Sequence, residues 1–524
     1  MLPSDAFHVY DTTLRDGSQC EGMSLSVNDK LAIARHLDDL GVGFIEGGWP
    51  GANPKDTEFF RRAQSELSLG TAQLTAFGST RRAGGVAADD LAPLRESGAG
   101  IVCMVAKSDV RHVERALRTT REENLAMIRD SVAHLRAEGQ RVFLDAEHFF
   151  DGYVADPSYA IEVLRTAAEA GADVVVLCDT NGGMLPHRLA DIVAEVVGTG
   201  LRVGIHAHND AACAVANSLA AVQAGATHVQ GTANGYGERC GNADLFSVVA
   251  ALENKEGREV LPAGRLVELG RVAHAVAEVA NMVPDPRQPW VGASAFAHKA
   301  GLHVSAIKAD PDLYQHTDPA AVGNDMRLLV SELAGRATIE LKGKALGLEP
   351  DRAAVGRVIE RVKNLESIGY SFEAAEASFE LLLREEMGER PHYFDLESWR
   401  VIVERRADGE IVSEATVKLY AKGERIVATG EGNGPVNALD NGLRLALEKL
   451  YPALASMELV DFKVRIVSGA HGTSAVTRVL VETSDGTTEW DTVGVHENVI
   501  AASWQALEDA YTAGLLRDEQ QAGD

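Results

Sequence analysis

The chain has 524 residues, of which 45% are hydrophobic and 24% charged, the balance of a soluble globular protein with several domains. Its formal net charge of −27 argues against nucleic-acid or anionic-membrane partners. The sequence contains no run of about 20 apolar residues, so no membrane span is predicted. The first residues, MLPSDAF, do not resemble a secretory signal. The 5 cysteines are scattered without a CxxC spacing, which predicts a reducing, cytoplasmic location without disulfides.

Short β-branched segments alternate with amphipathic ones along the first half of the chain. The predicted strands are 9–14, 43–47, 73–78, 100–106, 141–147, 173–179, 202–208 and 227–232. Amphipathic stretches such as 28–40 and 121–138 separate them, so the pattern predicts parallel βαβ units. Eight units in about 250 residues fit an α/β fold, a closed (β/α)₈ TIM barrel, better than an open doubly wound sheet.

Polar side chains follow nearly every predicted strand at its C-terminal end. They are Arg15, Asp16, Glu46, Ser79, Lys107, Glu147, Asp179, Thr180, His206, His208 and Asn234. In a barrel these strand ends converge on one rim, where the active sites of barrel enzymes lie. The sequence therefore predicts an active site at this rim.

His206 and His208 are the sharpest feature of this set. Residues i and i+2 of a strand face the same side, so the two imidazoles point together. Asp16 ends the first strand, which neighbours the seventh and eighth strands once the barrel closes, and Asn242 follows the eighth strand. Two imidazole nitrogens with a carboxylate and an amide oxygen predict a divalent metal site.

Three further rim residues suit a substrate that carries a carboxylate. Arg15 would face away from Asp16 in a regular strand, so a bend is needed to bring both to the rim; its guanidinium suits a carboxylate or an oxyanion. Glu147 is a candidate general acid or base. Thr180 is either a ligand for the substrate carboxylate or a helix cap.

The glycine-rich segment 234–242, NGYGERCGN, matches neither the P-loop nor the dinucleotide fingerprint. Nucleotide binding is therefore not expected. We expect Cys240 within it to be a packing residue rather than a nucleophile, since no partner base is evident.

The second half of the chain changes character. We expect a barrel over 1–270, a helical connector over 271–392 and a duplicated βββα domain over 393–524. The duplication has an offset of about 64 residues, so that Ile402 matches Ile466, Val403 matches Val467 and Val436 matches Ile500. Such a domain outside the barrel suggests regulation, dimerisation or both.

Four motifs carry a resemblance to a known family. DTTLRDGSQ (11–19), GIHAHND (204–210), GYGERCGN (235–242) and AFAHKAGLH (295–303), with GNGPVNAL (432–439) in the duplicated domain, resemble the acyl-CoA Claisen-condensing isopropylmalate, homocitrate and citramalate synthases. EGGWPGANPKD (46–56) and DAEHFFDGY (145–153) are most similar to the citramalate branch. Val304-Ser305 replaces the Gln-Asp that is typical of isopropylmalate synthases, which argues against that branch.

The resemblance implies residue roles as well as a reaction. The metal ligands would be Asp16, His206, His208 and Asn242. The substrate-binding residues would be Arg15, Gln19 and Thr180. The catalytic residues would be Arg15, Glu147, His303 and Tyr314. The metal would be one divalent ion, Mn²⁺ or Mg²⁺ before Zn²⁺, and acetyl-CoA the co-substrate. The connector would reach the active site of a neighbouring subunit, which implies a homodimer.

Membership of the citramalate branch would imply pyruvate as the 2-oxo acid, an acyltransferase activity, and the first step of a threonine-independent isoleucine route under allosteric control. An apolar pocket near Met104 would select pyruvate. The alternatives are the same chemistry on a larger 2-oxo acid, giving isopropylmalate or homocitrate, and a barrel lyase or aldolase. A metabolite sensor built on an inactive barrel is disfavoured, because every metal-ligand position is filled.

Overall fold

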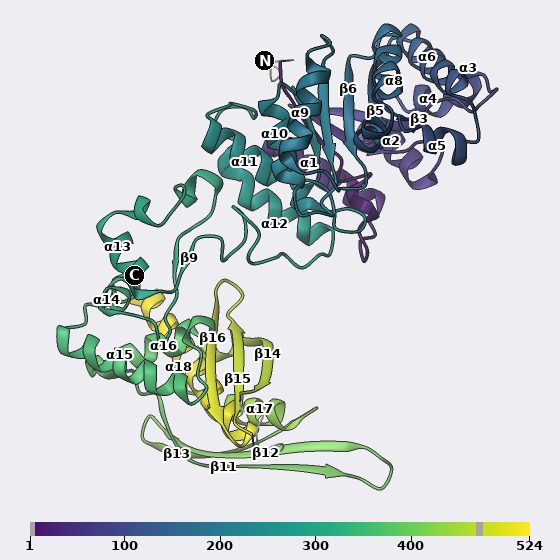
Figure 1. Ribbon diagram of the computed structural model, residues 1–524. Coiled ribbons are helices and arrows are strands. Elements are labelled where there is room, and N and C mark those ends of the chain that lie inside the picture. The colour runs from purple at the N-terminus through teal and green to yellow at the C-terminus, as the bar shows by residue number, and fades with distance from the viewer. Residues whose placement is uncertain (1–5, 468–474, 524) are drawn as a thin grey trace. The chain divides into compact units, whose positions relative to one another are not determined.

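The computed structural model describes residues 6–467 and 475–523. They form two compact units: Met1–Phe296 with Thr317–Asp325, and Ala297–His316 with Met326–Asp524 (Figure 1). Among the described residues, no helix has both the length and the apolar character needed to cross a membrane.

The first unit is a closed barrel of eight parallel strands in sequence order, in which β1 pairs with β8. The strands are β1 (His8–Asp11), β2 (Phe44–Gly48), β3 (Gln73–Ser79), β4 (Ile101–Lys107), β5 (Arg141–Glu147), β6 (Val174–Asp179), β7 (Val203–Ala207) and β8 (His228–Gly231). The predicted TIM barrel is confirmed.

Helices follow the strands around the barrel. They are α1 (Val27–Leu40), α2 (Pro54–Glu66), α3 (Ala87–Asp90), α4 (Ala92–Glu96), α5 (Val110–Arg115), α6 (Arg121–Ala137), α7 (Phe149–Ala155), α8 (Pro157–Glu169), α9 (Pro186–Val197), α10 (Ala214–Gln223), α11 (Leu245–Glu256) and α12 (Leu269–Val279). Local sequence sets their ends: α1 begins at a capping box between Ser26 and Asp29 and stops at Gly41, whose φ is 96°.

Strand residues alternate between two hydrophobic clusters. In β4, Cys103 belongs to the cluster that also holds Tyr10, Phe44 and Phe143, whereas Met104 belongs to the layer shared with the helices. This alternation follows from the two-residue period of a strand. It decides which residues can reach the barrel mouth.

The first strand is shorter than its predicted range of 9–14, because the chain turns after Asp11. The carboxylate of Asp11 accepts hydrogen bonds from the Thr13 N–H at 2.9 Å and the Thr13 hydroxyl at 2.8 Å. The carbonyl oxygen of Thr12 then accepts from the N–H groups of both Arg15 and Asp16. Arg15 and Asp16 therefore lie on the bend that the prediction required, not on a strand.

The second unit begins with a mixed segment. It contains a two-stranded parallel sheet, β9 (Ala297–His298) and β10 (Arg327–Leu328), and the helices α13 (Gly301–Ala309), α14 (Arg336–Ala345), α15 (Arg352–Ser367) and α16 (Glu376–Met387). The sequence pattern predicted helices here and did not indicate the short sheet.

The C-terminal part repeats one motif. Strands β11 (Phe394–Arg405), β12 (Ile411–Ala421) and β13 (Glu424–Gly432) form an antiparallel sheet followed by α17 (Pro435–Leu447). Strands β14 (Glu458–Ile466), β15 (Thr477–Ser484) and β16 (Glu489–His496) form another, followed by α18 (Val499–Gly523). Val436 and Ile500, which the repeat aligns, are each the second residue of their helix. Residues 468–474 of the second copy lie outside the described residues.

Candidate active site

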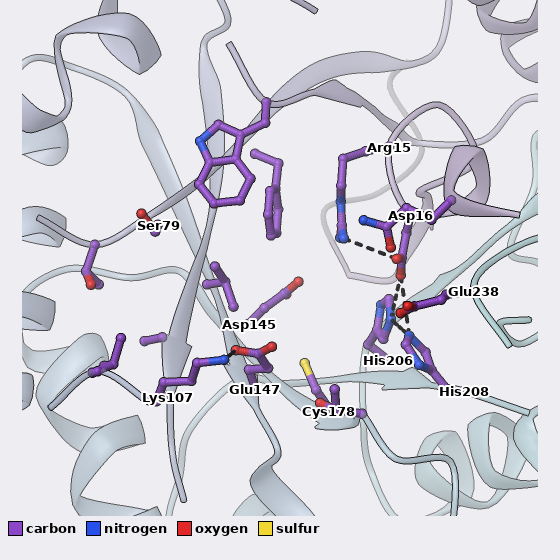
Figure 2. A pocket seen from close by; sticks show the side chains of 18 of the residues that line it. Arg15, Asp16, Ser79, Lys107, Asp145, Glu147, Cys178, His206, His208 and Glu238 are labelled. Carbon is purple, nitrogen blue, oxygen red and sulfur yellow. Dashed lines mark hydrogen bonds and ion pairs between the residues drawn. The ribbon is translucent and has the colours of Figure 1, made fainter. Parts of the chain in front are cut away.

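A cavity of about 450 Å³ opens among the C-terminal ends of the barrel strands. Its polar lining includes Arg15, Asp16, Gln19, Lys107, Asp145, Glu147, Thr180, His206, His208, Glu238 and Arg239, and its apolar wall includes Trp49, Phe77, Val105 and Leu117. Figure 2 shows Asp16, His206 and His208 gathered on one side, with Lys107 and Glu147 across the cavity. The rim predicted from the strand ends is therefore the place where the polar groups meet.

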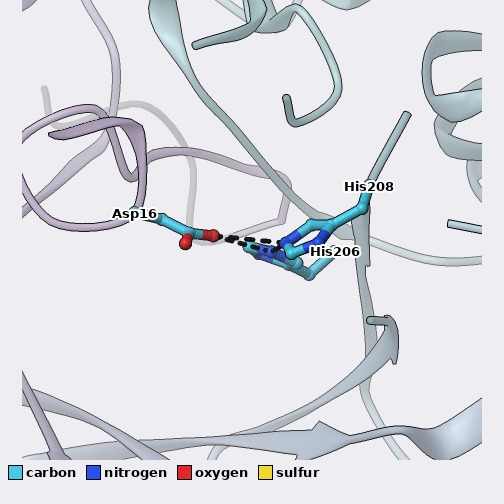
Figure 3. A group of neighbouring side chains, drawn as sticks. All are labelled: Asp16, His206 and His208. Atoms are coloured by element: carbon cyan, nitrogen blue, oxygen red, sulfur yellow. Dashed lines mark hydrogen bonds and ion pairs between the residues drawn. The ribbon is translucent and has the colours of Figure 1, made fainter. Parts of the chain in front are cut away.

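Asp16, His206 and His208 form one compact group of side chains that could hold a metal ion, called the metal-binding group below (Figure 3). The Asp16 Oδ2 atom lies 3.1 Å from His206 Nε2 and 3.5 Å from His208 Nε2. Burial acts to raise the pKa of Asp16, but the Arg15 guanidinium and hydrogen bonds from both histidines outweigh it and hold that pKa well below its usual range. Asp16 is therefore a carboxylate, which is the form that binds a cation.

Asn242 lies beside this group. Its backbone forms an antiparallel bridge with His208, and its Nδ2 donates to the Tyr236 carbonyl oxygen at 3.1 Å. Its Oδ1 is buried and has no hydrogen-bond partner among the described residues, an arrangement that costs about 1–3 kcal/mol unless another group satisfies it. A divalent cation bound to Asp16, His206 and His208 would be such a group, so these residues fit the metal.

Arg15 is held by an acidic partner beneath the cavity. Its Nε donates to Glu46 Oε1 at 2.5 Å, and its Nη1 lies 3.3 Å from Asp16 Oδ1. Its guanidinium carbon lies 3.8 Å from the centroid of the Phe77 ring, and the hydroxyl of Tyr10 donates to the other Glu46 oxygen at 2.6 Å. These contacts fix the orientation of the guanidinium at the cavity.

Glu147 ends β5 and pairs in register with Lys107 at the end of β4. Their side chains form an ion pair at the cavity and keep part of their surface exposed. Lys107 is thus a cationic partner of the predicted acid or base. The sequence placed Lys107 at the rim, and its position at the end of the strand next to that of Glu147 was the signal that could have predicted this pairing.

Thr180 and Gln19 both line the cavity. The Thr180 hydroxyl oxygen accepts from the backbone N–H of His148 at 2.8 Å. His148 precedes α7 with a left-handed φ of 58°. Thr180 therefore holds the start of α7 and does not cap its own following helix, which leaves the hydroxyl proton available for a ligand.

His303 and Tyr314 belong to the second unit, whereas the other predicted site residues belong to the first. Their rings stack on each other with centroids 4.2 Å apart. His303 lies on α13, and Tyr314 follows the short 3-10 helix Pro311–Leu313.

Arg239 is a cavity residue to which the sequence pattern assigned no role, although it lies in the glycine-rich motif. Its Nη2 lies 2.7 Å from His208 Nδ1 and donates to the Thr180 carbonyl oxygen at 2.8 Å, while its Nε donates to Asp210 at 2.8 Å. Arg239 therefore ties the loop after β8 to the strand ends that carry the metal-binding group.

Two expectations about single residues are wrong. Met104 is fully buried in the layer shared with the helices and does not line the cavity; Val105 does, because successive strand residues face opposite sides. Cys240 is exposed and is not a packing residue.

The fold and the site define a TIM-barrel enzyme whose barrel mouth carries a group of side chains that could hold a metal ion. Residues 6–283 match the family model described as HMGL-like, residues 290–369 the homocitrate synthase post-HMGL domain-like model, and residues 373–515 the LeuA allosteric (dimerisation) domain. These three regions follow one another along nearly the whole chain.

Three of the most similar relatives carry one name. A protein of Streptomyces coelicolor named (R)-citramalate synthase is 69% identical, over 98% of this chain and 97% of its own. Proteins of the same name from Aquifex aeolicus and Synechocystis sp. are each 48% identical, over 99% and 97% of this chain and 99% and 96% of their own. The chain therefore belongs to the HMGL-like family and, within it, to the group whose members are named (R)-citramalate synthase.

Proposed function

We propose that this chain catalyses the condensation of acetyl-CoA with pyruvate to give (R)-citramalate, as an acyltransferase. The single observation that carries the proposal is the group Asp16, His206 and His208 at the barrel mouth, beside a preset Arg15. The names of the relatives supply the product, the family resemblance implies acetyl-CoA and pyruvate as the substrate pair, and the site has the residue types that such a condensation requires.

One divalent ion, Mn²⁺ or Mg²⁺ with Zn²⁺ as a third option, would be held by Asp16, His206, His208 and Asn242. When bound, it supplies Lewis-acid polarisation of the 2-oxo group. Mixed imidazole and oxygen ligands suit several divalent ions.

The remaining side chains bind the 2-oxo acid and move protons. Arg15 presents its guanidinium to the keto oxygen as negative charge develops there, and the Thr180 hydroxyl and the Gln19 amide hold the substrate carboxylate. Glu147, with His303 and Tyr314, takes a proton from the acetyl methyl group. The methyl carbon then bonds to the keto carbon of pyruvate while the electron pair of the C=O π bond moves to the keto oxygen, and the alkoxide formed takes up a proton from the same acid/base residues.

Hydrolysis of the resulting thioester completes the reaction. Water adds to the thioester carbonyl, the carbon–sulfur bond breaks, and free CoA leaves with its thiol protonated while the acyl group becomes a carboxylate. We propose that the apolar wall at Phe77 and Val105 receives the methyl group of pyruvate, so that branched 2-oxo acids have less room.

We further propose that the chain acts as a homodimer in the cytoplasm, through the part that matches the LeuA dimerisation domain. The product would enter the threonine-independent route to isoleucine. A cavity of about 860 Å³ in that part, lined by residues 433–437 at the start of α17, by Arg444 and by Ile500, would receive the allosteric effector.

A free-thiol assay tests the proposal. The chain is given acetyl-CoA, Mn²⁺ or Mg²⁺, and in turn pyruvate, 2-oxobutyrate, 2-oxoisovalerate and 2-oxoglutarate. We expect CoA release with pyruvate, abolished by a chelator and by His206→Ala but not by His187→Ala, an exposed histidine on α9. Preference for a larger 2-oxo acid would keep the mechanism and change the product, and no CoA release with any substrate would overturn the condensation.

A further inference from the structure

A chain of buried hydrogen bonds runs beneath the metal-binding group. Gln230 on β8 has no exposed surface. Its Oε1 lies 2.8 Å from His206 Nδ1, and its Nε2 donates to Asp145 Oδ1 at 2.9 Å. The thiol of Cys103 donates to the same Asp145 oxygen at 3.2 Å.

The orientation of the Gln230 amide follows from Asp145. Asp145 Oδ1 already accepts from Cys103, so any proton on this carboxyl group would be on Oδ2, and Oδ1 is an acceptor in either state. An amide turned the other way would place two acceptor oxygens 2.9 Å apart. The Gln230 Nε2 therefore faces Asp145, and its Oε1 faces His206.

This orientation determines which nitrogen of His206 carries the hydrogen. An amide oxygen only accepts, so the Nδ1 of His206 must donate to it. Because Nδ1 keeps its hydrogen on Gln230, Nε2, which lies 3.1 Å from Asp16 Oδ2 and donates to it, is the nitrogen that gives up a proton when a cation binds. A histidine binds a metal through its unprotonated nitrogen, and the partner of the other nitrogen sets the tautomer.

His208 provides the contrast within the same group. Its Nδ1 lies 2.7 Å from the Nη2 of Arg239, and a guanidinium can only donate. This contact favours a hydrogen on His208 Nε2. Of the two histidines, only His206 has an acceptor that holds a hydrogen on its Nδ1.

We propose that Gln230 is a positioning residue that keeps His206 in the tautomer whose Nε2 can bind a divalent cation. The proposal rests on the proposed function, in which His206 is a metal ligand. Gln230 acts through His206 and Asp145 and needs no contact with substrate. Its neutral amide sets the tautomer without adding a further charge beside Glu46 and Asp145, two buried carboxyl groups whose pKa values burial raises.

The test is the binding of Mn²⁺ to the metal-stripped full chain in the absence of substrate. Calorimetry, or the electron paramagnetic resonance signal of free Mn²⁺, measures this binding. Gln230→Met keeps the length of the side chain and removes the acceptor. Gln230→Glu keeps an acceptor and, when protonated beside Asp145, also a donor. Gln140→Leu is the matched control, since Gln140 is a buried amide that donates to the carbonyl oxygens of Leu94 and Ala99, away from the cavity.

We expect Gln230→Met to raise the Kd for Mn²⁺ by about 10–100-fold, the effect typical of losing an outer hydrogen-bond partner of a ligand. Gln230→Glu and Gln140→Leu should bind Mn²⁺ with a Kd close to that of the parent. In the thiol assay, Gln230→Met should need more Mn²⁺ for half-maximal activity while it recovers most of kcat at saturating Mn²⁺.

Three outcomes would overturn the proposal. They are a Gln230→Met variant that binds as tightly as the parent, a Gln140→Leu variant that loses as much affinity, and a Gln230→Glu variant that is as weak as Gln230→Met. If Gln230→Met does not fold, a rise of about 10–100-fold in the Kd of Gln230→Glu relative to the parent would by itself overturn the proposal, because retained affinity is the expectation for Gln230→Glu. A parent chain that binds no Mn²⁺ would overturn the proposed function as well. A parent chain that binds Mn²⁺ and releases CoA from acetyl-CoA in the thiol assay would leave that function intact.

Discussion

Arg15 Nε and Glu46 Oε1 lie 2.5 Å apart, in a pair whose carboxylate has no exposed surface. The pair joins the turn after β1 to the middle of β2 and keeps the guanidinium at the cavity. Burial acts to lower the pKa of Arg15, but Glu46, Asp16 and Asp145 outweigh it and raise that pKa. Arg15 is thus a permanent cation, and Glu46 is the shortest of its contacts, which also include Asp16 and the Phe77 ring.

Glu46→Gln should therefore cost both stability and activity. Removing one partner of a buried ion pair leaves the other charge uncompensated, which costs about 3–5 kcal/mol in unfolding free energy. Urea denaturation and CoA release measure the two effects. Glu58→Gln is the matched control: Glu58 pairs with Arg61 on the surface, where both side chains are well exposed, and no measurable loss is expected. Equal losses in the two variants would contradict the role given to burial.

The turn after β1 should make the stability depend on pH. Burial raises the pKa of Asp11 to about 7. Because this pKa is higher in the folded than in the unfolded chain, the folded state binds the proton more tightly. The contribution to stability is therefore complete below about pH 4 and is lost as the pH rises through 7, by roughly 3–4 kcal/mol.

Asp11→Asn binds no proton and should remove this part of the pH dependence. The measurement is the unfolding free energy of parent and variant between pH 4 and 8. Asp485→Asn should leave the curve between pH 4 and 8 parallel to that of the parent, since hydrogen bonds from Thr487 and Thr488 lower the pKa of Asp485 to about 2 and its contribution is lost only as the pH falls from about 4 to 2. Parallel curves for the parent and Asp11→Asn would exclude Asp11 as the source.

Gly237→Ala should weaken metal binding through Asn242. A Cβ at residue 237 would lie 2.3 Å from Asn242 Nδ2, and Gly237 has a φ of 154°. Since Asn242 would have to move, we expect a higher Kd for Mn²⁺ and a loss of about 1–3 kcal/mol from backbone strain. Gly139→Ala is the control for strain alone, because Gly139 has a φ of 90° and a Cβ there would meet nothing within 4 Å. Its Kd for Mn²⁺ should equal that of the parent.

Val105 and Met104 should respond differently to truncation. Val105→Ala enlarges the cavity wall, so the rate with 2-oxobutyrate relative to pyruvate should rise about tenfold, the scale of small apolar changes in a pocket. Met104→Ala should leave this ratio unchanged and lower the unfolding free energy by about 2–5 kcal/mol, as a core truncation does. If the rate with 2-oxobutyrate relative to pyruvate changed in Met104→Ala and not in Val105→Ala, the assignment of the two faces of β4 would be reversed.

The sequence predicted the strands well, because β-branched runs bounded by turn residues depend on local preferences. All eight predicted strands are present, and the ends of most shift by only one or two residues. The grouping of Asp16, His206 and His208 was also predictable, since the spacing of His206 and His208 and the closure of the barrel both follow from regular strand geometry. Local turn chemistry at Asp11 was harder to foresee, and it alone shortened the first strand.

Other features depend on contacts between residues far apart in the chain. Gln230 is a neutral residue inside a strand, and nothing in its neighbourhood along the chain distinguishes it; only the packing of β7, β8 and β5 places it between His206 and Asp145. The pairing of β1 with β2 likewise places Glu46 against Arg15, which lies far from it in the chain. The sequence by itself determined the barrel, the repeat and the residue types at the rim, because these follow from periodicity. The tertiary structure decided which of those residues pair, face the cavity or set a tautomer, because such relations arise only when distant strands pack side by side.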